Sequence, residues 1–422
     1  MSEDRRSVPD SRRKIRIALV VPELTAIGGL RRVVEFFVRA LGALGSYETA
    51  VVSLAQIRNS PDSIRLLDPR TWVRGVRVAN GTWEYGDFRH VGCVFSEFEF
   101  QRYRTRAALT EILREYDLIQ VVANTPAWAL AATRSGRPIC LQAATLARLE
   151  RRSALKNARG VVGHWRRTMC GLTEKLDLRG LRVADVTFVM NPYMYQYASS
   201  NAAQSRVVLA PPGIDTGFFR PRVYAAGGYI LSVGRFQDPR KNVRLLFQSY
   251  ASLRSMLTRP PALVLVAGTY PTAEDLAFAS ALGIADSVFL HADVSDEELR
   301  RLYQGAALFV LSSDEEGLGL VILEAMACGL PIASTRCGGP DQIISEAGCG
   351  RLSPAGSAAD LTSSMRDLFA KPGLRAEMGS RAREYVEARF SDDKAILPFL
   401  QVYQQLLSAR GVALARSATS SS

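Results

Sequence analysis

The sequence is poor in residues that hold metals or form disulfides. It has three histidines among 422 residues, and no two of its six cysteines form a CxxC pair. The cysteines are Cys93, Cys140, Cys170, Cys328, Cys337 and Cys349. This spacing argues against a disulfide framework and against a zinc site, and it fits a reducing compartment.

Long hydrophobic runs are also missing. No stretch of about 18 consecutive apolar residues occurs, so we expect no membrane-spanning segment. The apolar run at residues 17–21 is too short for the core of a signal peptide. We therefore expect a cytoplasmic protein, free or bound peripherally to the cytoplasmic face of a membrane.

Acidic residues are outnumbered by basic ones. The chain has 41 Asp and Glu against 53 Lys and Arg, a net charge of +12. This excess favours acidic partners, namely phosphorylated ligands, anionic lipid or nucleic acid. With 47% hydrophobic residues the chain can bury a sizeable core, and its length predicts two domains.

Apolar runs alternate with amphipathic helical patterns along the chain. The first series predicts strands at 15–21, 48–54, 118–122, 139–141 and 186–190, and helices at 30–44 and 103–115. The second series predicts strands at 229–233, 262–267, 288–290, 307–311 and 332–334, and a helix at 243–256. The fold class predicted is therefore α/β, with two doubly wound, Rossmann-like domains built on parallel sheets. The Pro- and Gly-rich segment 211–221 reads as the linker between them.

The segment 312–339 carries the strongest chemical signal. It sets Glu316 and Glu324 on either side of a glycine-containing turn, between a buried strand and a helix that starts near Gly319. The turn presents backbone N–H groups at a helix N-terminus, where an anion is favoured. Its residues are Gly317, Leu318, Gly319 and Leu320. Solvated surface acids are the alternative interpretation.

Two other loops follow strands at the same predicted edge. Gly28 and Gly29 come after the first strand and open a helix, so the backbone can approach a phosphate; a purely structural turn is nearly as good an interpretation. Arg235 and Lys241 follow the first strand of the second series and suit a departing diphosphate, although a solvated basic loop is the alternative. The backbone at Val294 could meet a flat ring.

Residues 146–182 form a basic stretch with interleaved apolar residues. The bases are Arg148, Arg151, Arg152, Lys156, Arg159, Arg166, Arg167, Lys175, Arg179 and Arg182, against three acids. Such a stretch can lie on an anionic membrane, and a solvated helix face is an equally good interpretation. Its aromatic residues are too sparse for a base-stacking platform, so we expect no nucleic acid partner.

Together these motifs resemble a retaining glycosyltransferase of the GT-B fold, in family 4 of the nucleotide-sugar-dependent enzymes (glycosyl transferases group 1). The resemblance covers most of the chain. It is carried by PPGIDTGFF at 211–219, GRFQDPRKN at 234–242 and EEGLGLVILEAMACGLPIAS at 315–334, which contains the family's E-x7-E pattern. One departure exists: the strand that ends at residues 142–145 lacks the His that many members carry there.

The resemblance implies a role for each of these residues. Glu324 would bind the donor ribose, Glu316 the donor sugar, and Arg235 and Lys241 the diphosphate. The amides of residues 317–320 would hold sugar and phosphate, and the Gly28–Gly29 turn would contact the diphosphate from the other domain. These cations and amides would stabilise the departing charge, so neither a metal nor another cofactor is expected.

The resemblance also predicts the domain layout. We expect a disordered basic tail at 1–13, an acceptor domain at 14–212, a nucleotide-sugar donor domain at 213–388, a helix crossing back at 389–410 and a disordered tail at 411–422. The acceptor would carry a hydroxyl group and be lipid-linked or a precursor of cell-envelope or exopolysaccharide. A soluble natural-product acceptor and a non-catalytic binding protein of the same fold are the alternatives.

Overall fold

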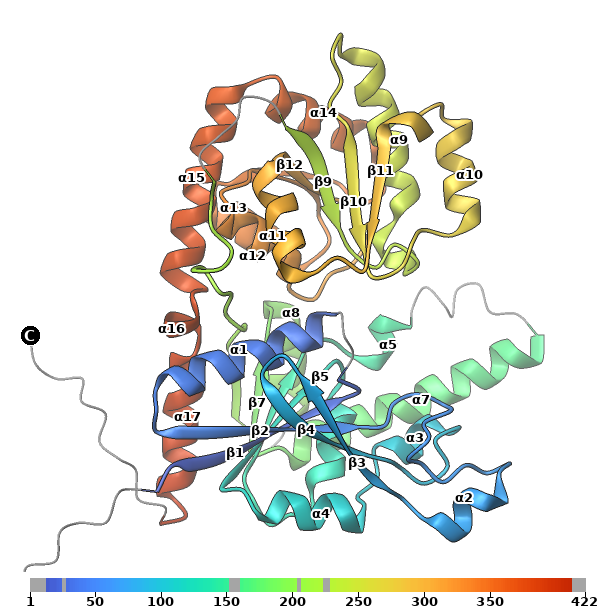
Figure 1. Ribbon diagram of the computed structural model, residues 1–422, viewed down its shortest axis with the longest axis vertical. Helices are drawn as coiled ribbons and strands as arrows, with labels where there is room; N and C mark the ends of the chain where they lie inside the picture. Colours follow the sequence, from blue (N-terminus) through green and yellow to red (C-terminus); the bar gives the residue numbers. More distant parts are fainter. Residues whose placement is uncertain (1–12, 25–27, 152–159, 203–205, 223–227, 412–422) are drawn as a thin grey trace, which may run out of the picture.

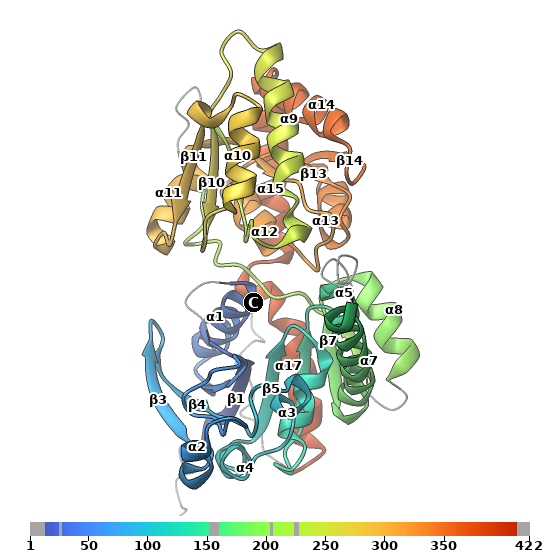
Figure 2. The ribbon, with the colours of Figure 1, turned by 90° about the vertical axis from the view of Figure 1, so that its right-hand side faces the viewer.

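The computed structural model describes residues 13–24, 28–151, 160–202, 206–222 and 228–411. It has two α/β domains, one above the other in Figures 1 and 2, each built on its own sheet. The predicted tails lie outside the described residues apart from Arg13 and Gly411, and Arg152, Lys156 and Arg159 of the basic stretch also lie outside them. The fold class predicted from the sequence is confirmed.

The amino-terminal domain holds an eight-stranded sheet in the order β3-β4-β2-β1-β5-β6-β7-β8. The strands are β1 (Ile15–Pro22), β2 (Tyr47–Leu54), β3 (Val78–Trp83), β4 (Gly86–Val91), β5 (Leu118–Ala123), β6 (Ile139–Ala143), β7 (Val186–Val189) and β8 (Arg206–Leu209). All neighbours pair in parallel except β3 with β4, which form an antiparallel hairpin at one edge. The central strands are buried, β5 along its whole length and β1 at every residue except Arg16, as expected for a parallel sheet covered on both faces.

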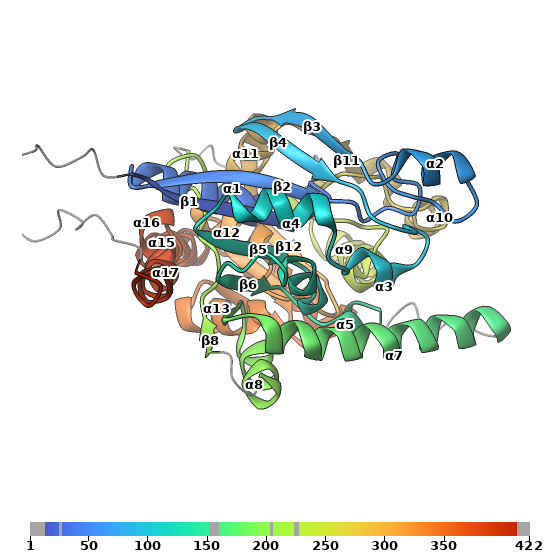
Figure 3. The same ribbon diagram turned by 90° about the horizontal axis from the view of Figure 1, so that it is seen from below.

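Helices connect these strands. They are α1 (Gly29–Ala43), α2 (Pro69–Arg74), α3 (Glu99–Arg102), α4 (Ala107–Arg114), the 3-10 helix η1 (Pro126–Ala132), α5 (Ala147–Glu150), α7 (Gly160–Val183) and α8 (Pro192–Asn201). Seen from below, α7 runs along one side of the domain and extends beyond it (Figure 3).

The carboxyl-terminal domain holds a six-stranded parallel sheet in the order β11-β10-β9-β12-β13-β14. Its strands are β9 (Tyr229–Val233), β10 (Leu263–Ala267), β11 (Val288–Ala292), β12 (Ala306–Leu311), β13 (Ile332–Thr335) and β14 (Gly350–Ser353). Its helices are η2 (Pro239–Lys241), α9 (Val243–Met256), α10 (Ala273–Ala281), η3 (Ala285–Ser287), α11 (Asp296–Gly305), α12 (Leu320–Ala327), α13 (Gly339–Ala347), α14 (Ala358–Phe369) and α15 (Pro372–Arg389). β9, β10 and β11 point towards the other domain, so their carboxyl ends face it (Figure 1).

The chain end crosses back to the amino-terminal domain through α16 (Asp392–Ala395) and α17 (Leu397–Ser408). The ring of Phe399 packs 4.9 Å from Phe37 and 4.3 Å from Phe188, between ring centroids. The hydroxyl of Tyr403 donates a hydrogen bond of 2.6 Å to Gln120 of β5. This helix therefore fixes how the two domains are joined.

Two predicted elements differ from the structure. The helix predicted at 103–115 is shortened to α4, which begins only at Ala107 because the backbone at Arg106 is extended and the Arg106 side chain is buried. The expected continuous helix in the crossing segment is divided into α16 and α17, and Pro398, which lacks an N–H, lies at the start of the second.

Four strands, β3, β4, β8 and β14, were not predicted. Glycine lowers strand propensity, which hid β3. Here Gly81 makes room for the ring of Phe88 on β4, because a Cβ at Gly81 would lie 2.4 Å from that ring.

Candidate functional site at the domain interface

Lys241 and Glu316 meet at the carboxyl end of the second sheet. Lys241 ends η2, which follows β9, and Glu316 follows the neighbouring strand β12. The Lys241 ammonium donates a hydrogen bond to the Glu316 carboxylate, and the Ser313 hydroxyl donates another to the same oxygen at 2.7 Å. The structure therefore brings these two predicted residues together as a partly buried ion pair.

Backbone and side-chain hydrogen bonds hold the two loops together. The N–H of Asp314 donates to the carbonyl of Arg240 at 2.7 Å, and the Ser312 hydroxyl donates to the carbonyl of Lys241 at 2.9 Å. The Asn242 amide donates to the carboxylate of Asp314 at 2.9 Å. The Lys241–Glu316 pair thus lies on a rigid support.

Arg235 does not join this pair. Its side chain is 65% exposed, and its nearest acid is Asp238, at 3.6 Å between Nη2 and Oδ2. Lys241 and Arg235 were predicted as partners at a diphosphate. The structure places Lys241 at Glu316 and leaves the Arg235 guanidinium in solvent.

Two helix N-termini face each other across the domain interface. Gly319, with φ 78°, caps α12 in a left-handed conformation that glycine adopts without strain. In the described residues no hydrogen-bond acceptor is found for the N–H groups of Gly317, Leu318, Gly319 and Leu320. Helix α1 opens at the Gly28–Gly29 turn, and a Cβ on Gly29 would lie 3.8 Å from Leu320 Cδ1. The two turns predicted to bind phosphate therefore approach each other closely.

Glu324 is buried, with 3% of its surface exposed. The Tyr303 hydroxyl of α11 donates a hydrogen bond of 2.8 Å to its Oε2. Burial raises the pKa of Glu324 above its ordinary value, against the opposing effects of Arg32 and this hydrogen bond. The structure thus places Glu324 one turn into α12, as predicted, but inside the interface and not open to solvent.

Arg32 also lies at this interface, although no motif in the sequence marks it. Its Nε lies 3.3 Å from Glu324 Oε1, and its two Nη atoms bond the Asp296 carboxylate at 2.7 Å each. Burial disfavours its charge, but Glu324 and Asp296 outweigh burial and hold the pKa of the Arg32 guanidinium above its ordinary value. The one feature that could have suggested it is its position on the first turn of α1, three residues after Gly29.

Acidic side chains cluster around this arginine. Carboxylate oxygens of Glu35, Glu84 and Asp296 lie within 4.8 Å of one another, a spacing that a metal ion could bridge. Arg31 bonds both Glu35, at 2.6 Å, and Glu84, at 3.1 Å. Because Arg31 and Arg32 already compensate these carboxylates, the cluster fits an ion-pair network better than a metal centre.

Val294 lies at the same edge of the sheet, after β11. It is half-buried beside Asp293, whose φ of 51° is left-handed. His291, near the end of β11, lies at the same edge, and its Nδ1 is 3.6 Å from the Glu298 carboxylate. The position of Val294 is compatible with the predicted contact to a flat ring.

The segment that lacks the family's His also reaches the interface. The carbonyl oxygen of Ala144 lies 3.0 Å from where a Cβ of Gly317 would be, and the Asn191 amide donates a hydrogen bond of 2.7 Å to the Gly317 carbonyl. Glu150 of α5 lies near Arg240 of the other domain. Burial opposes the charge of Arg240, but Asp238 and, less strongly, Glu150 favour it and raise its pKa.

The basic stretch contains α5, α7 and the residues between them, and α7 packs its inner face against η1. A Cβ on Gly180 would lie 2.1 Å from the carbonyl of Pro126, so the two elements touch closely. The Asp177 carboxylate accepts hydrogen bonds from the N–H groups of Ala127 and Ala147, at 3.0 and 2.9 Å. Burial raises the pKa of Asp177 to about 7.

The outer face of α7 is basic. Its exposed bases are Arg166, Arg167, Lys175, Arg179 and Arg182. Arg151, before α7, instead pairs with Glu99 and is half-buried. Of the apolar residues interleaved with these bases, Met169 and Leu172 are half-buried and Trp165 is exposed. Helix α7 therefore has a basic outer face and an inner face that packs against η1.

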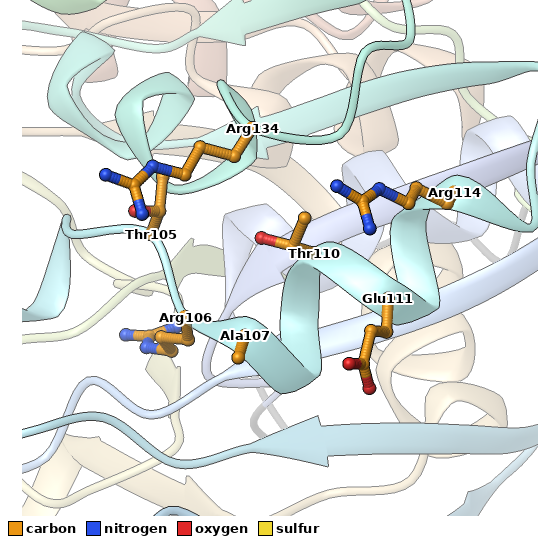
Figure 4. A pocket seen from close by; sticks show the side chains of 7 residues that line it. All are labelled: Thr105, Arg106, Ala107, Thr110, Glu111, Arg114 and Arg134. Atoms are coloured by element: carbon orange, nitrogen blue, oxygen red, sulfur yellow. The ribbon is translucent and has the colours of Figure 1, made fainter.

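A separate hollow of about 250 Å³ lies beside α4, on the side of the amino-terminal domain away from the interface. It is lined by Thr105, Arg106, Ala107, Thr110, Glu111, Arg114 and Arg134 (Figure 4). It contains none of the predicted site residues. Glu111 points away from the arginines in this view.

Comparison with known proteins supports the resemblance. The family model described as "Glycosyl transferases group 1" matches residues 217–385. A D-inositol 3-phosphate glycosyltransferase of Arthrobacter sp. is 34% identical over 43% of this chain and 46% of its own. One of Gordonia bronchialis is 29% identical over 81% of this chain and 76% of its own. A GDP-mannose-dependent phosphatidylinositol monomannoside mannosyltransferase of Mycolicibacterium smegmatis is 29% identical over 47% and 56%.

The chain spans only about half the length of most of the curated relatives that it matches. Among solved structures, sucrose-phosphate synthase of Thermosynechococcus elongatus has a TM-score of 0.72 at 21% identity, covering 94% of this chain and 100% of that one. HepE of Anabaena, in complex with UDP and glucose, has a TM-score of 0.65 at 16% identity, covering 93% and 100%. The two α/β domains thus have the GT-B architecture.

Proposed function

We propose that the protein is a retaining glycosyltransferase of family 4 that moves a sugar from a nucleotide diphosphate sugar to a hydroxyl acceptor. One observation carries the proposal: the Lys241–Glu316 pair lies at the carboxyl ends of β9 and β12, opposite the Gly28–Gly29 turn. Beside it lie the amides of residues 317–320, which have no acceptor among the described residues. Ligands of doubly wound folds bind at such sheet edges. The Anabaena neighbour's complex with UDP and glucose agrees with a nucleotide sugar as donor.

Charge defines the proposed chemistry. Breaking the anomeric bond leaves negative charge on the departing diphosphate and positive charge on the sugar. Lys241 and the two facing helix N-termini would stabilise the diphosphate, and Glu316 would hold the sugar and keep Lys241 oriented. Arg235 extends from the same loop and would fold onto the phosphates when they bind. The acceptor hydroxyl would attack the anomeric carbon from the face that the diphosphate leaves, so the new glycosidic bond keeps the anomeric configuration. The leaving phosphate would accept the hydroxyl's proton, and with Lys241 and the amides compensating its charge no metal is needed.

Donor binding requires a rearrangement at Glu324. Its two carboxylate oxygens are engaged by Arg32 and by the Tyr303 hydroxyl. A ribose could reach Glu324 only after Arg32, on the other domain, moves away. We therefore propose that the donor enters an opened interface and that Arg32 and Glu324 separate at this step.

For the acceptor we propose a lipid-linked or cell-envelope precursor at the cytoplasmic membrane face. The exposed basic face of α7 supports this, because basic residues near an anionic surface are each worth about 1 kcal/mol. The Mycolicibacterium relative is named for a phosphatidylinositol acceptor, which also agrees. In the described residues no helix is long and apolar enough to cross a membrane.

A soluble acceptor is the second candidate. It is favoured by the relatives named D-inositol 3-phosphate glycosyltransferase, whose named acceptor is a small phosphorylated polyol. A non-catalytic protein of this fold is the third, prompted by the missing His. The Lys241–Glu316 pair argues against it, because it places a cation and a carboxylate at the sheet edge where ligands of doubly wound folds bind.

A thermal-shift screen with UDP-, GDP- and ADP-sugars tests the proposal. A ligand present at 100 times its Kd stabilises the folded state by roughly 2.7 kcal/mol, so the cognate donor should raise Tm clearly. The other two nucleotides should do so less. No shift with any of the three would count against a nucleotide-sugar enzyme.

A further inference from the structure

Large apolar side chains gather on one exposed segment of the amino-terminal domain, around α2. Val73 is 95% exposed, Leu67 83%, Trp72 51% and Leu66 38%. We name these four residues the α2 patch. Scattered exposed hydrophobics are ordinary, but four within eight residues, two of them almost fully in solvent, indicate a surface that is covered in use.

The segment that carries the patch is held rigidly. The Trp72 indole N–H donates to the carbonyl of Arg65 at 2.7 Å, and the N–H of Arg65 donates to the Thr71 hydroxyl at 2.9 Å. The Trp72 ring also packs on Phe95, at 6.1 Å between centroids. Because the indole N–H is satisfied internally, the ring needs no polar partner outside. The α2 patch is therefore held in a fixed conformation while its apolar side chains stay exposed.

Basic residues surround the patch. Residues 57–78 contain five arginines and two aspartates, a charge of 5 − 2 = +3. Asp68 pairs with Arg65, and in the described residues no carboxylate forms an ion pair with the other four arginines. They are Arg58, Arg70, Arg74 and Arg77, all exposed. A partner that covers the α2 patch must therefore offer an apolar interior to the four apolar side chains and negative charge at its surface to the arginines.

We propose that the α2 patch inserts into the interfacial region of an anionic membrane. Insertion would bury Leu67, Trp72 and Val73 among acyl chains and place the flanking arginines at the headgroups. A second copy of this chain is a poorer partner, because a two-fold contact would bring +3 against +3.

The position of the patch supports the same partner. In Figures 1 and 3, α2 and the outward end of α7 lie on the same side of the amino-terminal domain. That end of α7 exposes Trp165, Arg166 and Arg167. One membrane plane can meet both elements, with α7 supplying charge and α2 the apolar anchor that the packed inner face of α7 cannot supply. This inference rests on the proposed function in one respect, the acceptor at the membrane that gives the protein a reason to bind there.

Flotation with vesicles of phosphatidylglycerol and phosphatidylcholine in equal amounts tests the inference. The variant Leu67→Ser/Val73→Ser loses two side chains that make almost no contacts in the protein, so its fold should be unaffected. We expect its vesicle partition coefficient to fall roughly tenfold or more. The matched control is Met256→Ser/Phe289→Ser, which removes two half-exposed apolar side chains from the other domain and should bind like wild type.

A labelled variant reports insertion directly. All six native cysteines are buried, so a fluorophore on Leu67→Cys can be attached selectively. Its emission should shift to the blue with anionic vesicles, and a label on Phe289→Cys should not shift. Equal flotation of wild type and Leu67→Ser/Val73→Ser would overturn the inference. The inference would also be overturned if analytical ultracentrifugation showed that wild type is a dimer and that Leu67→Ser/Val73→Ser is a monomer. Acceptor-independent donor hydrolysis should be unchanged in the double variant, and its absence in wild type would count against the proposed function instead.

Discussion

Arg32 of α1 and Glu324 of α12 form an ion pair across the domain interface, with 3.3 Å between Nε and Oε1. Asp296 holds the same guanidinium from a second helix of the other domain. A residue expected at the donor ribose is thus neutralised by the opposite domain. We therefore expect Glu324 to become available to a ligand only when the domains separate and its pairing with Arg32 is broken.

Arg32→Ala should lower stability by about 3 kcal/mol, because it leaves Glu324 and Asp296 without their cation. Calorimetry at fixed pH measures the effect. Arg32→Ala/Glu324→Gln should recover part of it, since the buried charge is then gone as well. A loss in Arg32→Ala no greater than in an exposed control such as Arg259→Ala would show that the pair contributes nothing to the interface.

Glu324→Ala should weaken binding of the cognate nucleoside diphosphate roughly tenfold while changing kcat less. A hydrogen bond from a ribose hydroxyl to a carboxylate is made in both the ground and transition states, so its loss mainly affects affinity. Isothermal titration separates the two effects. Unchanged affinity would place the ribose away from Glu324.

The sequence predicted the elements whose signals are local. β9 and α9 have the predicted bounds, and α12 starts within one residue of the prediction, because unbroken apolar runs and helical periodicity fix such elements. That Lys241 and Glu316 lie at the same edge also followed from the rule that parallel strands end together, but their ion pair was not predicted. The hairpin of β3 and β4 could not be predicted in this way, since Gly81 acts there through its contact with Phe88.

Contacts between distant residues explain the remaining differences. The burial of Glu324 depends on Arg32 from the other domain, and no local pattern records that approach. The basic stretch looked amphipathic, but whether its apolar residues face η1 or a membrane depends on tertiary packing. Asp177, counted only as an acid in the sequence, binds two backbone amides in the core.

Asp177 should make stability depend on pH. Its pKa is raised from 3.8 to about 7 by burial, so the folded state binds the proton more tightly than the unfolded state. Stability attributable to this group should therefore fall as the pH rises from about 4 to about 7. Asp177→Asn should flatten the Tm profile over that range. A profile that keeps its slope in the variant would assign the effect to other groups.

Exposed arginines on α7 should contribute electrostatic binding to anionic vesicles. Arg166→Ser/Arg167→Ser should weaken pelleting, and Arg259→Ser/Arg351→Ser, two exposed changes in the other domain, should not. Arg151 is unsuitable for this test because it pairs with Glu99. Wild-type binding should decline as the Debye length falls from about 10 Å at 0.1 M to about 3 Å at 1 M salt. Salt-independent binding of wild type would exclude an electrostatic role for α7.

The most direct test is release of nucleoside diphosphate from UDP-, GDP- and ADP-sugars without acceptor, in wild type and in Lys241→Ala. We predict slow hydrolysis of one donor by wild type and a rate lower by roughly 10²–10³-fold in Lys241→Ala, the scale for losing one donor to a developing charge. Arg254→Ala, which removes an arginine paired with Asp286 on the surface of the same domain, should hydrolyse at the wild-type rate. Equal rates in wild type and Lys241→Ala, or no release from any donor that binds wild type, would contradict the proposed site.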